Sequence, residues 1–429
     1  MDIIIKPCEG INGDIYVPPS KSFSQRAIAS SILIPSLEIK NLGKSADELA
    51  ALEIIKILGA KIEWKSDSHL LVNSNFDFHR EIILNCGESG LCARLFSGLM
   101  LLNAGKTTFI GQGSLLQRPM NSIYTIYEQL GIDYQSNLDF LPLSIVGSRC
   151  AIDLEMEGSV SSQFVTGILF YLVGLRHHEV LNLKISNLSS RPYVDMTVET
   201  LKSLGAHIEW QDGDELQVIP SKLKLNSTII VEGDWSSAAF WIGAAAIDGK
   251  ISLKGLNPHS QQADSIILKI IKDYGAETIR ENDVLCIQSK HHKPIEVDLS
   301  DAPDLAPIVA VLAIFAEGES LIKGVKRLKH KESDRLQGIL NWLEMLNIQY
   351  NLREDHLTIV GKSKIKLRRE IAINIEFETY QDHRMVMASS ILALFLNGGR
   401  VKGYTAVHKS YPDFFQDLKY AGGRFFYSN

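Results

Sequence analysis

Two stretches of the sequence repeat nearly the same pattern: ALEIIKILGAKIEW at residues 51–64 and TVETLKSLGAHIEW at residues 197–210. In the first, Leu52, Ile55 and Leu58 recur at helical spacing, and Gly59 follows directly. A glycine at the end of such a pattern is typical of a helix that stops in the left-handed conformation. The next residues, KIEWKSDSHLLV, alternate as strand, polar turn, strand. Each stretch therefore predicts an amphipathic helix followed by two short strands.

Four further stretches carry the same pattern, and the six expected helix stops are about 70 to 76 residues apart. This period is too long for an ordinary solenoid repeat and indicates a supersecondary unit. Six such units predict two domains of three units each, with the middle near residue 230, where TIIVEGDWSSAAFW restarts a strand-to-helix pattern. The further copies are SIYTIYEQLGIDYQ (122–135), IILKIIKDYGAETI (266–279) and, less clearly, ILNWLEMLNIQYNL (339–352) and FFQDLKYAGGRFFY (414–427).

Composition narrows the class of protein. A chain of 429 residues with 45% hydrophobic residues exceeds what one core usually supports. The net charge of -6 and the lack of a basic tail argue against nucleic-acid binding. No leader-like or membrane-length apolar run is present, so we expect a soluble cytoplasmic protein. Five scattered cysteines have no metal-site spacing and suit a reducing compartment: Cys8, Cys86, Cys92, Cys150 and Cys286.

Several polar residues of the first half fall at expected helix starts, where backbone N–H groups favour anions. Ser20 is a natural N-cap, which places Lys21 and Ser22 in the first turn and Arg26 one turn later. Taken alone, these segments also allow a plainer interpretation: a solvated basic helix start, an ordinary serine cap or a surface arginine. The other candidates are Gly87 and Gly90 with Arg94, then Arg118, the run Ser161, Ser162 and Gln163, and the turn with Ser190 and Tyr193.

The second half offers a denser set of charges. Lys331 and Arg335 are four residues apart at an expected helix head, which is unfavourable for like charges unless an anion is present. Glu332 beside them could exchange protons. Asp382, His383 and Arg384 precede a strongly apolar helix, Lys409 precedes another, and Asp301 or Asp304 could be a helix cap or a base.

Together these motifs resemble the 5-enolpyruvylshikimate-3-phosphate synthase (3-phosphoshikimate 1-carboxyvinyltransferase) family. The resemblance implies an α/β fold of two similar domains, each of three βαβαββ repeat units, with the active site in the interdomain cleft. It assigns residues 20–230 to the N-terminal domain, and 1–19 with 231–429 to the C-terminal domain. The strings that carry it, in family order, are PSKSFSQR (19–26), QRP (117–119), GSVSSQF (158–164), RPY (191–193), KESDR (331–335), DHRM (382–385) and HKSYPDFF (408–415).

The resemblance also implies transfer of the enolpyruvyl group of phosphoenolpyruvate to the 5-hydroxyl of shikimate 3-phosphate by addition and elimination. It implies a monomer acting on small molecules, with no cofactor or metal. Asp304 would be the base, and Glu332 with Lys21 the proton-exchange pair. Phosphoenolpyruvate would meet Lys21, Gly90, Arg94, Arg118, Gln163, Arg335, Arg384 and Lys409. Shikimate 3-phosphate would meet Lys21, Ser22, Arg26, Ser161, Ser162, Gln163, Ser190, Tyr193, Asp304 and Lys331.

Three residues depart from the family pattern and bear on substrate geometry and inhibitor response: Glu88 and Leu91 in the first glycine motif, and Arg327 where an asparagine is expected. Two alternatives remain. A sister enzyme transfers enolpyruvyl to UDP-N-acetylglucosamine, but it typically has a Lys-Asn pair and a loop cysteine, whereas Lys21-Ser22 stands here and residues 110–120 hold no cysteine. A non-catalytic metabolite-binding paralogue would be expected to lose Asp304, Glu332 or Lys21, and all three are present.

Overall fold

The computed structural model describes residues 1–147, 150–175, 177–371 and 375–428. It divides into two compact units: one comprises Met1–Pro18 with Gly233–Asn429, and the other Pro19–Glu232. We call them the outer unit and the inner unit, after their places in the sequence. The sequence-based domain proposal set its limits at residues 20 and 230.

The inner unit contains three four-stranded sheets within the described residues. In each, the first strand of the spatial order is parallel to the second, and the remaining neighbours are antiparallel. The orders are β14(Asn226–Ile230)-β3(Ser36–Lys40)-β5(His69–Asn73)-β4(Lys61–Ser66), β6(Ile82–Asn85)-β7(Lys106–Ile110)-β9(Phe140–Val146)-β8(Tyr134–Asn137) and β10(Leu154–Glu157)-β11(Leu181–Ser186)-β13(Glu215–Ile219)-β12(His207–Trp210).

The outer unit repeats this plan with three sheets of the same pairing, again counted over the described chain. The orders are β2(Ile11–Tyr16)-β15(Gly249–Lys254)-β17(Val284–Gln288)-β16(Glu277–Glu281), β18(Glu296–Asp298)-β19(Gly318–Lys323)-β21(His356–Gly361)-β20(Gln349–Arg353) and β22(Ile375–Phe377)-β23(Gly399–Lys402)-β1(Asp2–Lys6)-β24(Arg424–Ser428).

Three strands complete sheets built mostly from distant parts of the chain. Strand β2, in the N-terminal segment, pairs with β15 in the first sheet of the outer unit. The N-terminal strand β1 lies between β23 and β24, near the other end of the sequence. Strand β14 pairs with β3, so it joins the last strand of the inner unit to its first sheet. The predicted α/β fold of repeated units is therefore confirmed. A distant strand completes one sheet of the inner unit (β14) and two sheets of the outer unit (β1 and β2).

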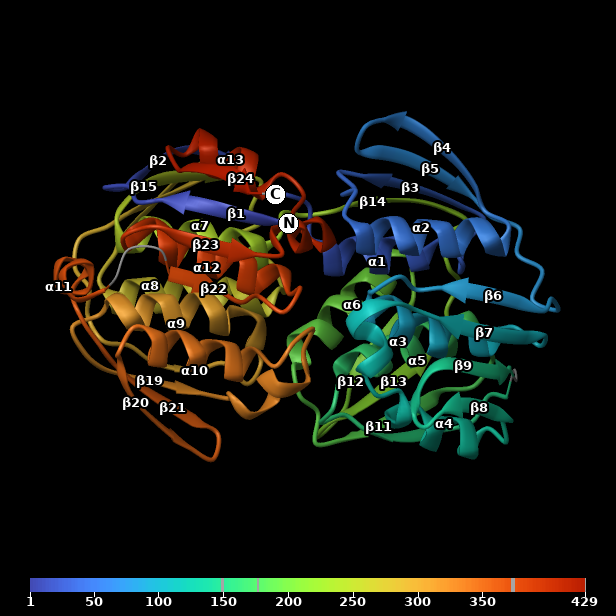
Figure 1. The fold of residues 1–429 in the computed structure, drawn as a ribbon. Helices are drawn as coiled ribbons and strands as arrows, with labels where there is room; N and C mark the ends of the chain where they lie inside the picture. Colours follow the sequence, from blue (N-terminus) through green and yellow to red (C-terminus); the bar gives the residue numbers. More distant parts are fainter. Residues whose placement is uncertain (148–149, 176, 372–374, 429) are drawn as a thin grey trace. The chain divides into compact units, whose positions relative to one another are not determined.

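Each repeat also has two helices (Figure 1). The first is largely buried, and in most repeats it is strongly apolar, whereas α1 buries several polar side chains. The buried helices are α1(Lys21–Ser30), α3(Gly90–Leu99), α5(Ser162–Gly174), α7(Trp235–Ile247), α9(Ala306–Phe315) and α12(His383–Phe395). The second helices are α2(Ala46–Leu58), α4(Tyr124–Gln129), α6(Arg191–Ser203), α8(Ile267–Tyr274), α10(Arg335–Met345) and α13(Phe414–Tyr420), and α11(Lys364–Glu370) lies outside this pattern.

The six expected helix stops all adopt positive φ angles, as the repeat predicted. Asn347 shows that the stop does not require glycine, since asparagine also tolerates the left-handed region. The φ angles are 112° at Gly59, 63° at Gly131, 96° at Gly205, 106° at Gly275, 49° at Asn347 and 96° at Gly422.

The starts of the buried helices matter most for function. Several of the polar side chains that the sequence singled out lie in the first two turns of these helices, among them Lys21 and Arg26 on α1, Arg94 on α3 and Arg384 on α12. Five of these helices begin after a serine or aspartate whose side chain accepts a backbone N–H, namely Ser20, Ser89, Ser161, Asp234 and Asp382.

Candidate active site

Arg26, on α1 of the inner unit, is 1% exposed and is held by neutral oxygens. Its Nε donates to Thr197 Oγ1 at 2.8 Å, and Nη2 donates to Thr166 Oγ1 at 3.2 Å and to the Tyr193 carbonyl at 2.9 Å. Nη1 donates to the Ser22 carbonyl at 2.7 Å. Burial lowers the pKa of Arg26 to about 10. The guanidinium remains charged at neutral pH while no carboxylate contacts it in the part of the chain that the structure describes.

Arg94 lies on α3 and joins it to the start of α5. Its Nη1 donates to Gln163 Oε1 at 3.1 Å and to Ser161 Oγ at 3.4 Å. Its Nη2 donates to the carbonyl of Pro119, and its guanidinium carbon lies 5.2 Å from the centre of the Phe164 ring. These contacts bring together three of the residues that the sequence nominated, from segments far apart in the chain.

Arg118 lies against the start of α3. A Cβ placed on Gly90 would lie 2.2 Å from Arg118 Nη1, so only glycine permits this approach. Arg118 is 7% exposed and is the residue after a 3₁₀ turn at Gly113–Gln117. The first glycine motif and Arg118 therefore form one local structure, as a site for an anion requires.

Lys21, the first residue of α1, forms an ion pair with Asp47. Their Nζ and Oδ2 atoms are 3.0 Å apart, and both side chains are 12% exposed. Asp47 lies in the first turn of α2, which begins with a capping box between Ser45 and Glu48. Sequence reasoning missed Asp47, because an acid in the first turn of a helix is ordinary.

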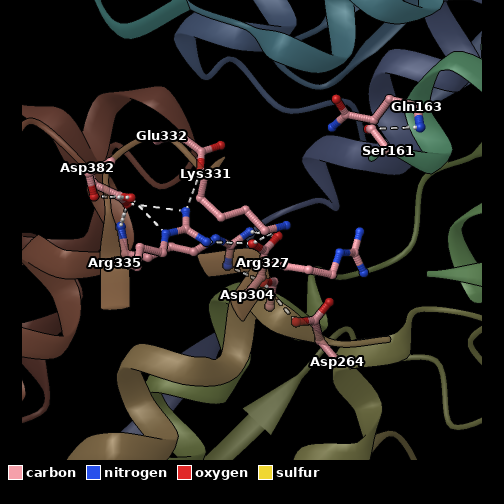
Figure 2. A network of polar contacts seen from close by, with 12 residues as sticks. Ser161, Gln163, Asp264, Asp304, Arg327, Lys331, Glu332, Arg335 and Asp382 are labelled. Carbon is pink, nitrogen blue, oxygen red and sulfur yellow. Dashed lines mark hydrogen bonds and ion pairs between the residues drawn. The ribbon is translucent and has the colours of Figure 1, made fainter. Parts of the chain in front are cut away.

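Arg335, the first residue of α10 in the outer unit, is completely buried and is surrounded by carboxylates (Figure 2). Its Nε donates to Asp382 Oδ2 at 2.7 Å, and Nη1 donates to Asp304 Oδ1 at 2.6 Å. Nη2 donates to Glu332 Oε2 at 2.5 Å and to the second Asp382 oxygen at 3.3 Å. Burial alone would lower the pKa of Arg335, but the three carboxylates raise it well above its ordinary value.

Three cationic side chains contact the carboxylate of Asp304. In addition to Arg335, its Oδ2 lies 3.1 Å from Arg384 Nη2, and its Oδ1 lies 3.6 Å from Lys331 Nζ. Burial alone would raise the pKa of this carboxyl, but the three cations together hold it well below its usual range. Burial lowers the pKa of Lys331, although Asp304 opposes that shift. Asp304 is therefore an anion at neutral pH, and its neighbours oppose its protonation.

The helix at KESDR begins later than predicted. Lys331 and Glu332 lie before α10, whose N-cap is Asp334, and Lys331 has extended backbone angles. The anion that the sequence required between Lys331 and Arg335 is present, and it is the protein's own Asp304.

The remaining nominated residues have simpler surroundings. Lys409 Nζ donates to the Gln381 carbonyl at 2.8 Å. Ser190 is a buried N-cap residue with φ 55°, and Tyr193 is half-buried in the first turn of the helix that follows it. Ser162, the first residue of α5, is buried.

Sequence reasoning missed two residues of the outer unit: Ser236, which contacts Arg384 of the predicted set, and Asp264, which contacts Ser236. The Ser236 hydroxyl, in the first turn of α7, accepts a hydrogen bond from Arg384 Nη1 and donates one to Asp264 Oδ1 at 3.3 Å. A serine in an apolar helix and a lone aspartate before another helix give no signal in a single sequence, because only the fold brings them to Arg384.

The residues that depart from the family pattern have definite positions. A Glu88 carboxylate oxygen accepts from the Ser114 backbone N–H at 3.4 Å, so Glu88 contacts the turn that leads to Arg118. Leu91 is buried in the first turn of α3. Arg327 Nη1 donates to the Ser300 carbonyl at 2.8 Å, and burial lowers its pKa.

No group of three or more His, Cys, Asp or Glu side chains in the described residues could hold a metal ion. Among the helices of the described chain, none has the length and apolar character needed to cross a membrane.

Curated relatives match almost the whole chain. The 3-phosphoshikimate 1-carboxyvinyltransferase of Clostridium acetobutylicum is 36% identical over 425 residues, which covers 98% of this chain and 97% of the relative. The protein of the same name from Methanopyrus kandleri is 35% identical over 428 residues, covering 96% of each.

Solved structures agree. EPSP synthase from Acinetobacter baumannii superimposes with a TM-score of 0.82 at 25% identity, covering 99% of this chain and 100% of that one. The enolpyruvyl transferase NikO from Streptomyces tendae gives a TM-score of 0.78 at 16% identity, covering 100% and 98%, and shows the shared fold. The family model for EPSP synthase (3-phosphoshikimate 1-carboxyvinyltransferase) matches residues 5–418. The chain therefore belongs to the EPSP synthase family.

Proposed function

We propose that the protein transfers the enolpyruvyl group of phosphoenolpyruvate to the 5-hydroxyl of shikimate 3-phosphate and releases inorganic phosphate. The observation that carries this proposal is the set of buried cations at helix starts, in a chain that belongs to this family over residues 5–418. Both substrates are small polyanions. Guanidinium groups fixed by their surroundings suit phosphate and carboxylate, because their planar N–H forks match those groups.

In this proposal the two substrates use different parts of the nominated set. Phosphoenolpyruvate takes the guanidinium and ammonium groups, which neutralise its phosphate and carboxylate, with Gly90 and Gln163 beside them. Shikimate 3-phosphate takes the serine hydroxyls at the helix starts together with Lys21, Gln163, Tyr193 and Lys331, and Arg26 acts on it through its buried charge. The cations proposed for phosphoenolpyruvate are Lys21, Arg94, Arg118, Arg335, Arg384 and Lys409.

The first proposed step is an addition. The π electrons of phosphoenolpyruvate take a proton at C3, and the shikimate 5-oxygen forms a bond to C2 while its own proton goes to Asp304. Glu332 or Lys21 supplies the proton at C3. Asp304 suits this role because its carboxylate is ionised at neutral pH. The two bound substrates compete with Asp304, phosphoenolpyruvate for Arg384 and shikimate 3-phosphate for Lys331. This competition weakens the two ion pairs and raises the proton affinity of the Asp304 carboxylate.

The second proposed step is an elimination. Whichever of Glu332 and Lys21 gave up its proton in the addition takes one back from the C3 methyl group. The C2=C3 double bond forms again, and the C2–O bond to phosphate breaks with its electron pair on the departing phosphate. Fixed cations stabilise this developing charge without reorganisation, and in many enzymes such electrostatic stabilisation contributes most of the rate enhancement. The proposal includes no cofactor or metal. Location in the cytoplasm, the monomeric state and the assignment of the two units as transferase domains stay predictions.

The test is phosphate release from phosphoenolpyruvate by purified protein, with shikimate 3-phosphate or UDP-N-acetylglucosamine as acceptor. Asp304→Asn should lower kcat by about 10²- to 10⁴-fold, because it removes the base without changing size. Asp301→Asn is the matched control, since Asp301 is exposed just before the same helix and should leave kcat unchanged.

Release that requires shikimate 3-phosphate supports the proposal. Release only with UDP-N-acetylglucosamine would assign the sister activity. If a folded wild-type protein releases no phosphate with either acceptor, it is a binding protein instead.

A further inference from the structure

Arg384 of the outer unit is held on two sides by groups of different kinds. Its Nη2 faces the proposed base Asp304 at 3.1 Å, whereas its Nη1 donates to the hydroxyl of Ser236. Its backbone N–H is also fixed, because it donates to Asp382 Oδ1 at 2.9 Å. The residue is 8% exposed in all, so these contacts determine where its guanidinium points.

The hydrogen bonds through Ser236 have a fixed direction. A guanidinium only donates and an ionised carboxylate only accepts, whereas a hydroxyl can do both. Ser236 therefore accepts from Arg384 and donates its single proton to Asp264 Oδ1 at 3.3 Å. Because Asp264 is 1% exposed, its charge reaches Arg384 with little screening. Burial and the neighbouring Arg335 lower the pKa of Arg384, whereas Asp304 and, to a smaller extent, Asp264 raise it, and the result is a raised pKa.

Further hydrogen bonds hold the two segments that carry Ser236 and Asp264; we call the hydrogen-bonded series Arg384–Ser236–Asp264 the relay. Ser236 is in the first turn of the buried helix α7, whose N-cap Asp234 accepts the Ser237 N–H at 2.7 Å. Gln262, two residues before Asp264, accepts the Trp235 N–H at 3.0 Å and donates to the Gly233 carbonyl at 2.8 Å. The segment that carries Asp264 is thus fixed to the start of the helix that carries Ser236.

The geometry points to Ser236 and Asp264 as positioning residues that orient Arg384 toward the phosphoenolpyruvate anion, with Asp304 as the partner that the anion displaces. This inference rests on the proposed function. When Asp304 gives up Arg384 Nη2, the Ser236 contact keeps Nη1 in place. Without the hydroxyl, the guanidinium would follow Asp304 and meet the substrate less often in the required orientation.

The test compares steady-state kinetics of Ser236→Ala, Ser236→Thr and Asp264→Asn. Ser236→Ala should raise the KM for phosphoenolpyruvate about 10- to 100-fold, because a hydrogen bond to a charged group is lost. The KM for shikimate 3-phosphate should change less than about threefold, since Arg384 is assigned to the other substrate. Ser236→Thr keeps a hydroxyl and should restore most of the affinity. Asp264→Asn keeps an acceptor oxygen but loses the charge, so its effect should lie between those of the other two variants.

The matched control is Ser389→Ala. Ser389 is a buried serine on α12, the helix that carries Arg384, and its hydroxyl donates only to its own helix, at the Met385 carbonyl 2.6 Å away. This variant should leave both KM values unchanged. Isothermal titration with phosphoenolpyruvate, in the presence of shikimate 3-phosphate, gives the same comparison without turnover.

Equal KM values for phosphoenolpyruvate in Ser236→Ala and Ser389→Ala, with an active wild type, would overturn the relay and leave the proposed function standing. A rise of both KM values together in Ser236→Ala, not restored by threonine, would also overturn it, because general damage to the fold has that result. An inactive wild type would instead refute the proposed function.

Discussion

Arg26 and Arg335 are both fully buried arginines near helix starts, but one is held by neutral oxygens and the other by carboxylates. Arg26 contacts two threonine hydroxyls and two backbone carbonyls. Arg335 contacts the carboxylates of Asp304, Glu332 and Asp382. The pKa of Arg26 is lowered by burial, whereas the carboxylates raise that of Arg335.

The difference shows two ways of keeping a cation in a protein interior. Neutral oxygens satisfy the N–H groups of Arg26 but leave its full charge, which then acts on any nearby anion. Carboxylates cancel the charge of Arg335, so an incoming anion must compete with groups that are already bound. The positive charge of Arg26 in the inner unit therefore attracts an anion at all times. The positive charge of Arg335 in the outer unit attracts one only when the anion replaces a carboxylate partner.

The largest expected effect comes from Arg335→Met. It leaves three carboxylates close together without their shared cation, so the free energy of unfolding should fall by about 3–5 kcal/mol at pH 7. The loss should shrink at lower pH, because protonation relieves the repulsion that the variant creates. Urea unfolding followed by tryptophan fluorescence, at pH 7 and at lower pH, measures the loss and its dependence on pH. A loss below about 1 kcal/mol would mean that the carboxylates do not depend on Arg335.

Arg26→Met should cost less, about 1–3 kcal/mol, because hydroxyls and carbonyls lose a donor but no charge is orphaned. Substrate affinity should still fall, since the uncancelled charge is gone. The same urea experiment, run beside Arg335→Met, decides the order. If Arg26→Met were the more destabilising of the two, the contrast between neutral and carboxylate partners would be wrong.

Asp47→Asn tests whether an ion pair outside both arginine groups orients Lys21. The pair is only partly exposed, so we expect a change in stability below about 1 kcal/mol and a fall in kcat/KM of about tenfold. Glu53→Gln, which removes an exposed ion pair with Lys56 on the same helix, is the control and should leave kcat/KM unchanged. Equal kinetics in the two variants would remove Asp47 from the account.

The smallest effect should come from Glu48→Gln. Burial raises the pKa of Glu48, although Ser24, Ser45 and Lys21 oppose that shift. A carboxyl whose pKa is higher in the folded state than in the unfolded state costs stability as pH rises from its unfolded value through its folded value. The wild type should therefore lose stability relative to Glu48→Gln as pH rises above about 4.3. Parallel pH profiles of thermal unfolding would contradict this.

Much of the fold could be predicted from one sequence because its signals are local. Helical spacing followed by Gly59 or Gly205 specifies a helix and its stop within a dozen residues, whatever surrounds it. The αL stop at Asn347 was predictable for the same reason. The pairing of β1 with β23 and β24 depends on contacts across nearly the whole chain, and here only the resemblance to a family placed the N-terminal segment in the C-terminal domain.

The candidate site divides in the same way. Ser20, Ser161 and Asp382 were recognisable as residues at helix starts, because capping is local. The partners of Arg26 are 140 to 171 residues away, apart from Ser22, and could not be read from spacing. Asp264 was missed for this reason too, since its role depends on Ser236 and Arg384 meeting it in the fold.

The central claim is that enolpyruvyl passes to shikimate 3-phosphate, and ¹³C nuclear magnetic resonance with [2-¹³C]phosphoenolpyruvate tests it most directly. The account predicts that the labelled carbon becomes an enol ether on the shikimate 5-oxygen, in equal amount to the phosphate released. Labelled pyruvate, or phosphoenolpyruvate left unchanged beside a folded wild-type protein, would contradict it.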